Sequence, residues 1–294
     1  MISGAGEEAL LQLLKMDDNK PSALFNYGAF DMAKYLSPGR VFPVSASLGC
    51  YWQRCSFCPE KAEGNPFVPL PAQQVIDEID VYNSKKSIGL IHFLDNALSP
   101  SFMKALITKK FNTPWYGFSR ITVELADPAY CKALKQSGCV MLKLGVESGS
   151  QQVLDDLTKG VTIELMSAVL HALHNAGIAT YVYLLFGTPP ETKSNAFKTV
   201  EFVEKHNAYI DFLNIAVFNL PVLSPEANEL ETTPFYNGDL SLYENFTHPH
   251  GWDRGNVRSY LDTVVKKNKA IGSILKNTPP LFTSNHAPFF VMNQ

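Results

Sequence analysis

One unit, a short apolar segment followed by a helical pattern, recurs along the middle of the sequence. Six such segments occur: VFPVSASL (41–48), SIGLIHFL (87–94), WYGFSRITV (115–123), CVMLKLGV (139–146), ATYVYLLF (179–186) and IDFLNIAVF (210–218). Nearly continuous apolar strands separated by helices predict an α/β fold with a parallel sheet. A closed barrel of this kind has eight strands, so six units predict an open, partial (βα)6 TIM-like barrel.

The intervening segments place apolar residues three and four positions apart, as amphipathic helices do. They cover residues 71–83, 99–108, 127–138, 150–160, 162–177 and 191–207. Ser99 followed by Pro100 predicts a helix N-cap and first turn, and Gly138 and Gly177 stand where a helix would end before the next strand.

The repeating units suggest three regions. Residues 1–40 are expected to form a short helix and a polar, Pro/Gly-punctuated linker, and residues 41–220 the partial barrel. Residues 221–294 contain a Pro-rich stretch, a helical pattern around 258–275 and an apolar tail, NHAPFFVMNQ. We expect this C-terminal extension, and in particular 221–252 and 285–294, to cap the barrel opening.

The charge balance and the apolar pattern limit the partners of the chain. Its formal net charge is −3, so no overall basic field favours nucleic acid or an anionic membrane. Neither an apolar run of eighteen residues nor a signal-peptide pattern occurs, which favours a cytoplasmic location. Of the five cysteines, three crowd into nine positions, a pattern that suits a metal site in a reducing compartment better than disulfides.

The three crowded cysteines are Cys50, Cys55 and Cys58, in GCYWQRCSFC directly after the first expected strand. In a parallel α/β architecture this is the carboxyl end of the sheet, where ligands bind. Three thiolates can bind three irons of a [4Fe–4S] cluster and leave the fourth iron open to nitrogen and oxygen donors of a small molecule. Structural zinc is the alternative, with His92 as a possible fourth ligand. Cys131 and Cys139 are expected to be buried, apolar groups.

Here the residues begin to resemble a known family. The cysteine trio after the first strand, with Phe57 before the last cysteine, is similar to the signature of the radical SAM superfamily. The segment 141–192, MLKLGVESGS through LLFGTPPET, resembles the central part of radical SAM enzymes that often carry a cobalamin-binding domain. The resemblance covers about 41–218. It departs at one point, because four residues separate Cys50 and Cys55 where the superfamily usually has three, and this bears on the geometry of the loop.

The resemblance implies a function. A [4Fe–4S] cluster would chelate S-adenosylmethionine (SAM) on its fourth iron and cleave it reductively to a 5′-deoxyadenosyl radical, which abstracts hydrogen from a small-molecule or peptidyl substrate. An external electron donor of the flavodoxin or ferredoxin type is implied as a partner. The alternative is a non-catalytic iron–sulfur or SAM-binding protein, or a truncated remnant of a B12-dependent radical SAM enzyme.

By the same resemblance, SAM contacts can be assigned to strand ends. Asp95 and Asn96, after the second strand, lie where the family binds the methionine amino group, although a turn role is an equal alternative for Asp95. Arg120, after the third strand, would bind the methionine carboxylate, with a plain salt bridge as its alternative. Glu147, after the fourth strand, would contact the ribose hydroxyls or the methionine end.

The adenine side is assigned to three further residues. Gly187, after the fifth strand, would let the backbone approach a flat ring closely, and Glu191 is expected in the first turn of the next helix, with an effect on the helix dipole alone as its alternative. Phe57 would lie against the adenine, with ordinary packing as its alternative. No residue is assigned a direct catalytic role.

Other motifs carry less weight. The opening SGAGEEALLQLL resembles the last turn and helix of a cobalamin-binding domain, but the sequence begins there, so cobalamin is not predicted as a cofactor. His248 and His250 suggest a surface loop rather than a metal pair. His171 and His174 lie on a helix expected outside the barrel, where packing or solvent contact is usual.

Overall fold

The computed structural model describes residues 7–15, 27, 30–31, 34–37, 39–86, 88–111, 113–237 and 241–278. Its centre is a six-stranded sheet in the order β1-β4-β5-β6-β7-β8, in which every neighbouring pair is parallel. The strands are β1 (Val41–Val44), β4 (Leu90–Phe93), β5 (Trp115–Ser119), β6 (Cys139–Glu147), β7 (Ala179–Phe186) and β8 (Phe212–Val217). Because spatial order follows chain order, each βα unit adds one strand, which confirms the predicted (βα)6 partial barrel.

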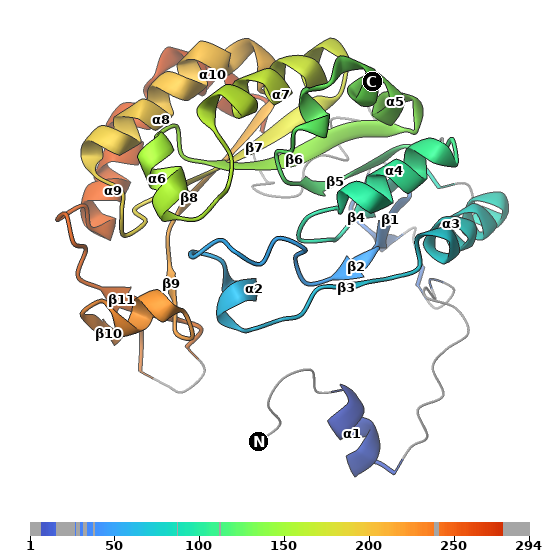
Figure 1. Ribbon diagram of the computed structural model, residues 1–294, viewed down its shortest axis with the longest axis horizontal. Coiled ribbons are helices and arrows are strands. Elements are labelled where there is room, and N and C mark those ends of the chain that lie inside the picture. Colours follow the sequence, from blue (N-terminus) through green and yellow to red (C-terminus); the bar gives the residue numbers. More distant parts are fainter. Residues whose placement is uncertain are drawn as a thin grey trace.

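Helices connect the strands and lie along one side of the curved sheet (Figure 1). They are α3 (Ala72–Lys86), α4 (Pro100–Thr108), α5 (Pro128–Gln136), α6 (Gln151–Asp156), α7 (Ile163–Asn175) and α8 (Lys193–His206). Ser99 caps α4 as predicted, because its side chain accepts a hydrogen bond from the Phe102 N–H. Gly138 and Gly177 follow the ends of α5 and α7 with φ of +94° and +70°, the left-handed conformation that favours glycine after a helix.

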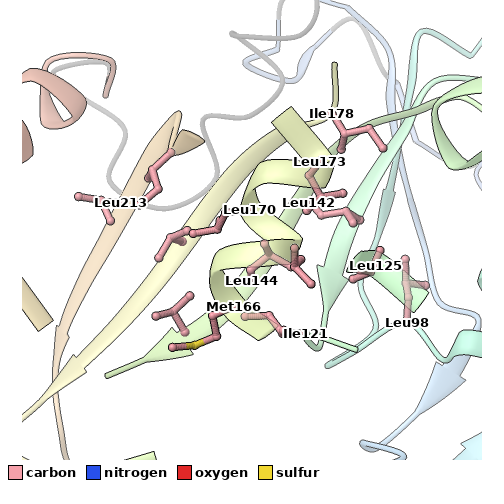
Figure 2. Close-up of a cluster of buried hydrophobic side chains, with 14 of the residues drawn as sticks. Leu98, Ile121, Leu125, Leu142, Leu144, Met166, Leu170, Leu173, Ile178 and Leu213 are labelled. Carbon is pink, nitrogen blue, oxygen red and sulfur yellow. The ribbon is translucent and has the colours of Figure 1, made fainter. Parts of the chain in front are cut away.

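The main hydrophobic core lies between the sheet and these helices. Figure 2 shows Leu142 and Leu144 of β6 facing Met166, Leu170 and Leu173 of α7. These five side chains are fully buried. Alternate residues along each strand therefore face this outer layer, as the period of two in a strand requires.

The other residues of each strand face the inner side of the barrel. At the amino ends of the strands a second, smaller cluster of buried residues closes this inner face: Leu90, Tyr116, Met141, Tyr181 and Phe212. Further along, several inner-face residues are only half-buried. The inner face is therefore fully buried at the amino ends of the strands and partly exposed toward their carboxyl ends.

The first predicted strand is divided. β1 ends at Val44, and Ser47–Leu48 forms β2, which pairs antiparallel with β3 (Val68–Pro69) in a separate two-stranded sheet. The Asp95 carboxylate accepts hydrogen bonds from the Ala46 N–H at 3.0 Å and the Ser47 hydroxyl at 2.5 Å, which fix the chain where it leaves the ladder. The segment between β2 and β3 carries the cysteines and the short helix α2 (Pro59–Ala62).

The residues after β8 form structure that the sequence did not predict. β9 (Leu220–Pro221), β10 (Thr232–Pro234) and β11 (Tyr243–Phe246) make a three-stranded antiparallel sheet beyond the end of β8 (Figure 1). The helical pattern around 258–275 is divided into α9 (Arg254–Tyr260), a π-helical turn (Leu261–Val265) and α10 (Lys269–Leu275). Asn268 caps α10 by accepting from the Ala270 and Ile271 N–H groups, so the chain restarts a helix there.

At the N-terminus, α1 (Glu7–Leu13) lies apart from the sheet in Figure 1. Most of the expected linker and the apolar tail 285–294 fall outside the described residues. Within the described residues, no helix has the length and apolar character needed to cross a bilayer.

Candidate metal and cofactor site

The cysteine loop lies between β2 and α2, and all three of its cysteines are free thiols. Cys55 is buried, and Cys50 and Cys58 are half-buried. The Cys58 carbonyl accepts from the Lys61 and Ala62 N–H groups, so α2 begins at the last cysteine. The helix thereby fixes the backbone at one end of the loop.

Two unusual backbone positions shape the rest of the loop. Gly49 has φ of +69°, and a Cβ there would lie 3.0 Å from the Pro66 carbonyl carbon and closer still to its oxygen, so only glycine fits. Gln53 has φ of +53°, uncommon for a residue with a side chain, and lies in the stretch between Cys50 and Cys55 that has one residue more than usual. The Ser56 N–H donates to the Leu157 carbonyl at 3.1 Å, which ties the loop to the end of α6.

Trp52 fills the space between this loop and the barrel. Its ring lies under the Arg120 guanidinium, 4.2 Å from the ring centroid, and its N–H donates to the Thr158 carbonyl at 3.4 Å. A Cβ at Gly160 would lie 2.9 Å from one ring carbon of Trp52 and closer to another, so glycine at this position makes room for the indole. Neither Trp52 nor Gly160 was singled out from the sequence.

Arg120 connects β5 to the cysteines. The strand ends at Ser119, one residue earlier than Arg120 and four residues before the end of the expected strand, so Arg120 leaves the ladder. One guanidinium nitrogen donates to the Cys55 sulfur at 3.5 Å, and the other donates to the Lys159 carbonyl. The side chain is buried, so a fixed positive charge lies beside a sulfur of the loop.

Glu147 lies at the end of β6, next to the same group. The pairing of β6 with β7 is irregular between Gly145 and Glu147, and Glu147 has φ of +62°, a strained conformation of the kind found at functional sites. Its carboxylate accepts from Lys159 Nζ at 2.8 Å, and both side chains are largely buried. A Cβ at Gly145 would lie 2.7 Å from Lys159 Nζ and closer to the carboxylate, so the ion pair lies over Gly145.

Lys159 links Glu147 to Phe57 and Arg120. Its ammonium group lies 5.5 Å from the Phe57 ring centroid, and its carbonyl accepts from Arg120. The structure thus brings together four residues chosen from the sequence, Cys55, Phe57, Arg120 and Glu147, through a lysine that sequence reasoning missed. The only sequence signal for Lys159 was its place before a glycine in the loop that follows α6.

Asp95 and Asn96 lie elsewhere on the carboxyl edge. Each oxygen of Asp95 has a partner in the segment that leads to the cysteines, as described above, and burial raises the pKa of this carboxyl although those hydrogen bonds oppose the shift. Asn96 is exposed. The geometry supports anchoring of the loop by Asp95, and within the described residues Asn96 makes no hydrogen bond to the cysteine group.

Gly187 and Glu191 belong to a second group. Glu191 is not in a helix turn as expected, because α8 begins at Lys193 after a Thr192 N-cap. Its carboxylate is fully buried and accepts from the Gly187 N–H at 2.6 Å and the Trp252 indole N–H at 2.9 Å. Burial raises its pKa from 4.5 to about 7. The carboxylate thus joins the turn after β7 to the C-terminal extension.

His248 also lies in this second group, which corrects one expectation. The sequence suggested a surface loop for His248 and His250, but His248 is buried and its ring bonds to the Thr188 carbonyl at 2.9 Å. The Pro-containing loop folds against the turn after β7, a long-range contact that local sequence cannot show. His250 is exposed, as expected. Cys131 and Cys139 are fully buried, which confirms their packing role.

The geometry of the cysteines bears on which metal they suit. Among the described residues, no three Cys, His, Asp or Glu side chains are grouped to bind one metal ion. Zinc requires all its ligand atoms within about 2.3 Å of a single ion, and His92 is stacked on Tyr116 with its Nε2 3.4 Å from Lys143 Nζ. In a [4Fe–4S] cluster each thiolate binds a different iron, so its ligands stand further apart. The loop offers three thiols, the number that a [4Fe–4S] cluster with one open iron needs and one fewer than a structural zinc site needs, and His92 is already engaged elsewhere.

The electrostatics of the loop agree with that fit. Burial raises the pKa of the Cys58 thiol, and the neighbouring Cys55 and Cys50 raise it further, while backbone N–H groups of the α2 start oppose the shift. Three thiolates are therefore unfavourable together without added positive charge. Bound iron supplies such charge and holds its thiol ligands deprotonated.

Comparison with known families identifies the superfamily of the chain. The model of the radical SAM superfamily matches residues 44–203, just over half of the 294-residue chain. The chain belongs to the radical SAM superfamily. The matched segment begins at the end of β1 and contains the cysteine loop, Arg120 and the Glu147–Lys159 pair.

Relatives of this radical SAM chain include a methyltransferase and a cyclase. It is 25% identical over 188 residues to an uncharacterized methyltransferase of Pyrococcus horikoshii, covering 61% of this chain and 40% of the relative. It is 24% identical over 251 residues to an anaerobic magnesium-protoporphyrin IX monomethyl ester cyclase of Rubrivivax gelatinosus, covering 82% and 44%. The chain thus spans less than half the length of these two relatives.

Solved structures share the fold. The radical S-adenosylmethionine methyltransferase TsrM from Kitasatospora setae, with tryptophan and a SAM analogue, superposes with a TM-score of 0.58 at 18% identity, over 71% of this chain and 44% of that one. The cobalamin-dependent radical enzyme OxsB with aqua-cobalamin superposes with a TM-score of 0.57 at 16% identity, over 75% and 41%. At these identities the likeness concerns the fold alone.

Proposed function

We propose that this chain forms the catalytic barrel of a radical SAM enzyme, in which Cys50, Cys55 and Cys58 bind a [4Fe–4S] cluster and SAM binds the fourth iron. When bound and reduced, this pair of cofactors supplies a 5′-deoxyadenosyl radical that abstracts hydrogen from a substrate. One observation carries the proposal: the buried Arg120 guanidinium, at the end of β5, donates to the Cys55 sulfur and to the Lys159 backbone, so the cysteine loop meets the end of β5 and the loop after α6, whose Lys159 pairs with Glu147 at the end of β6.

The charged residues beside the cysteines suit the methionine end of SAM. That end carries an ammonium and a carboxylate, and a buried pair of opposite charges, Glu147 and Lys159, lies within reach of the loop through Phe57 and Arg120. Glu147 would accept from the ammonium group or the ribose hydroxyls, and Arg120 or Lys159 would bind the carboxylate. Gly187 remains the candidate for the adenine side, with Glu191 holding its backbone in place.

Other residues would position the loop and exclude water. Trp52 covers one face of Arg120, which keeps solvent from the guanidinium and from the sulfur beside it. Asp95 fixes the segment that enters the loop. Water must be kept out because a radical intermediate reacts with whatever lies nearest.

The partners of the reaction follow from its chemistry. Reductive cleavage requires one electron, which an external flavodoxin- or ferredoxin-type protein would supply. The substrate, a small molecule or a peptide, would enter the inner face of the barrel, and we propose that residues 221–252 cap that opening.

Anaerobic reconstitution with iron and sulfide, followed by reduction with dithionite in the presence of SAM, tests the activity. We expect 5′-deoxyadenosine and methionine in equal amounts, and loss of both in Cys55→Ala. Cys131→Ala is the matched control, because Cys131 is buried among helices away from the loop. A chain that takes up iron and binds SAM but forms no 5′-deoxyadenosine would refute catalysis and support a non-catalytic SAM-binding role.

A further inference from the structure

Lys143 is a buried cation on the inner face of the barrel that the proposed cofactor site does not use. It lies in the middle of β6 and is 3% exposed. Its neighbours in the register are Phe118 of β5 and Tyr181 of β7. A lysine almost never lies this deep without a partner of opposite charge.

No such partner is found among the residues that the structure describes. No Asp or Glu lies within ion-pair distance of Lys143 there, and burial alone lowers the pKa of its ammonium group to about 8. At neutral pH the group therefore stays mostly protonated. Within the described part of the chain, its one hydrogen bond joins Nζ to His92 Nε2 at 3.4 Å.

His92 acts as the acceptor in that bond. Burial, with the charge of Lys143 as a second cause, lowers the pKa of its imidazole to about 3, so the ring is neutral at pH 7. The ring is stacked flat on Tyr116, with centroids 4.3 Å apart. His92 Nε2 accepts one of the three hydrogens of the Lys143 ammonium group. The other two hydrogens have no protein acceptor among the described residues.

Aromatic rings surround the ammonium group instead. Nζ lies 5.3 Å from the Tyr116 ring centroid and 5.1 Å from that of Phe118. The Tyr183 ring contacts Phe118 across β6, with centroids 4.8 Å apart. Phe118, Tyr183 and His92 are all half-buried, so each of these side chains keeps part of its surface exposed on the inner face. Ring faces attract a cation but do not replace a counter-ion.

The depth of Lys143 separates it from the cofactor site. Along β6, the fully buried Met141 belongs to the cluster that closes the amino end, and Glu147, four residues beyond Lys143, belongs to the group beside the cysteines. Lys143 lies between them, in the region that a substrate of the proposed reaction would occupy. This step rests on the function proposed above.

We infer that Lys143 binds an anionic group of the substrate, a carboxylate or a phosphate, while Phe118 and Tyr183 pack against a flat, unsaturated part of the same molecule. His92 holds the ammonium group in place. Lys143 is thus a substrate-positioning and specificity-determining residue rather than a ligand of the cofactors.

Equilibrium dialysis against the anaerobically reconstituted protein with SAM tests the inference with simple probes. Phenylacetate and phenyl phosphate carry the two candidate anions, and phenylacetamide is their neutral counterpart. We expect at least one anionic probe to bind about tenfold or more tightly than the amide, because a charge-assisted hydrogen bond is lost in the neutral probe. The better anion identifies the substrate group as carboxylate or phosphate.

Variants locate the effect. Lys143→Gln, with folding checked by circular dichroism, should bind all three probes alike, and Lys143→Arg should keep the preference. Lys132→Met, an exposed lysine of α5, is the matched control and should behave as the unmodified protein. No preference for either anion in the unmodified protein, or a preference that survives in Lys143→Gln, would overturn the inference.

The outcomes separate this inference from the proposed function. A protein that forms 5′-deoxyadenosine but does not prefer anionic probes would refute the role of Lys143 alone. A Lys143-dependent preference in a protein that never cleaves SAM would support the anion site and refute the radical reaction.

Discussion

Replacing Gly160 by alanine tests how the cysteine loop is held against the barrel. Gly160 has φ of +70°, and an added Cβ would overlap the Trp52 ring, against which the Arg120 guanidinium lies. The left-handed backbone costs about 1–2 kcal/mol for alanine, and overlap in a packed site about 1–3 kcal/mol more. The free energy of unfolding should therefore fall by about 2–5 kcal/mol in total.

Gly251→Ala is the matched control for the backbone part of this cost. Gly251 has φ of +64°, yet no atom lies within 4 Å of the Cβ that would be added. It should lose only about 1–2 kcal/mol. Urea denaturation followed by circular dichroism measures both changes, and the difference between the variants isolates the contact with Trp52.

Acrylamide quenching supplies a local readout. Of the three tryptophans, Trp115 and Trp252 are buried and Trp52 is half-buried, so Trp52 dominates the change in accessible fluorescence. Quenching should rise in Gly160→Ala and stay unchanged in Gly251→Ala. Equal losses of stability with no change in quenching would refute the packing of Trp52 against Gly160.

Two further predictions concern buried carboxylates. Lys159→Met leaves Glu147 as a buried charge without its 2.8 Å partner, so the free energy of unfolding should fall by about 3–5 kcal/mol. The double variant with Glu147→Gln should recover much of that loss. Urea denaturation measures both variants, and no recovery in the double variant would contradict the pairing. Burial raises the pKa of Glu191 from 4.5 to about 7, so the folded state binds this proton more tightly than the unfolded state does. The stability that this group contributes is therefore fully present below about pH 4.5 and is lost as the pH rises to about 7. Glu191→Gln, whose amide oxygen can still accept from Gly187 and Trp252, should flatten that part of the stability-versus-pH curve, and a curve identical to that of the unmodified protein would exclude the assignment.

The architecture could be predicted because its signals are local. Apolar runs such as 179–186 coincide with β7, and the caps at Ser99 and Gly177 act within one turn of their helices. The first strand was predicted too long because its break depends on Asp95, almost fifty residues away, which binds Ala46 and Ser47. The strands β9–β11 were missed because short, Pro-containing segments carry little alternation.

The site could be predicted only in part for the same reason. Cysteine spacing pointed to Cys55, and the family resemblance at the strand ends made Arg120 and Glu147 candidates. Trp52 and Lys159 were missed because their roles arise when the loop after α6 folds over two strand ends, a contact between segments far apart in the chain. Lys143 was read as part of an apolar strand, and its significance appears only when its surroundings are known.

Iron and sulfide analysis of the anaerobically reconstituted protein, joined to electron paramagnetic resonance after reduction, tests the central claim most directly. The account predicts about four irons and four sulfides per chain with the signal of a reduced [4Fe–4S] cluster. Both should be lost in Cys50→Ala, Cys55→Ala and Cys58→Ala and retained in Cys131→Ala. A protein that binds one zinc and no iron, or that keeps its iron when these three thiols are removed, would contradict it.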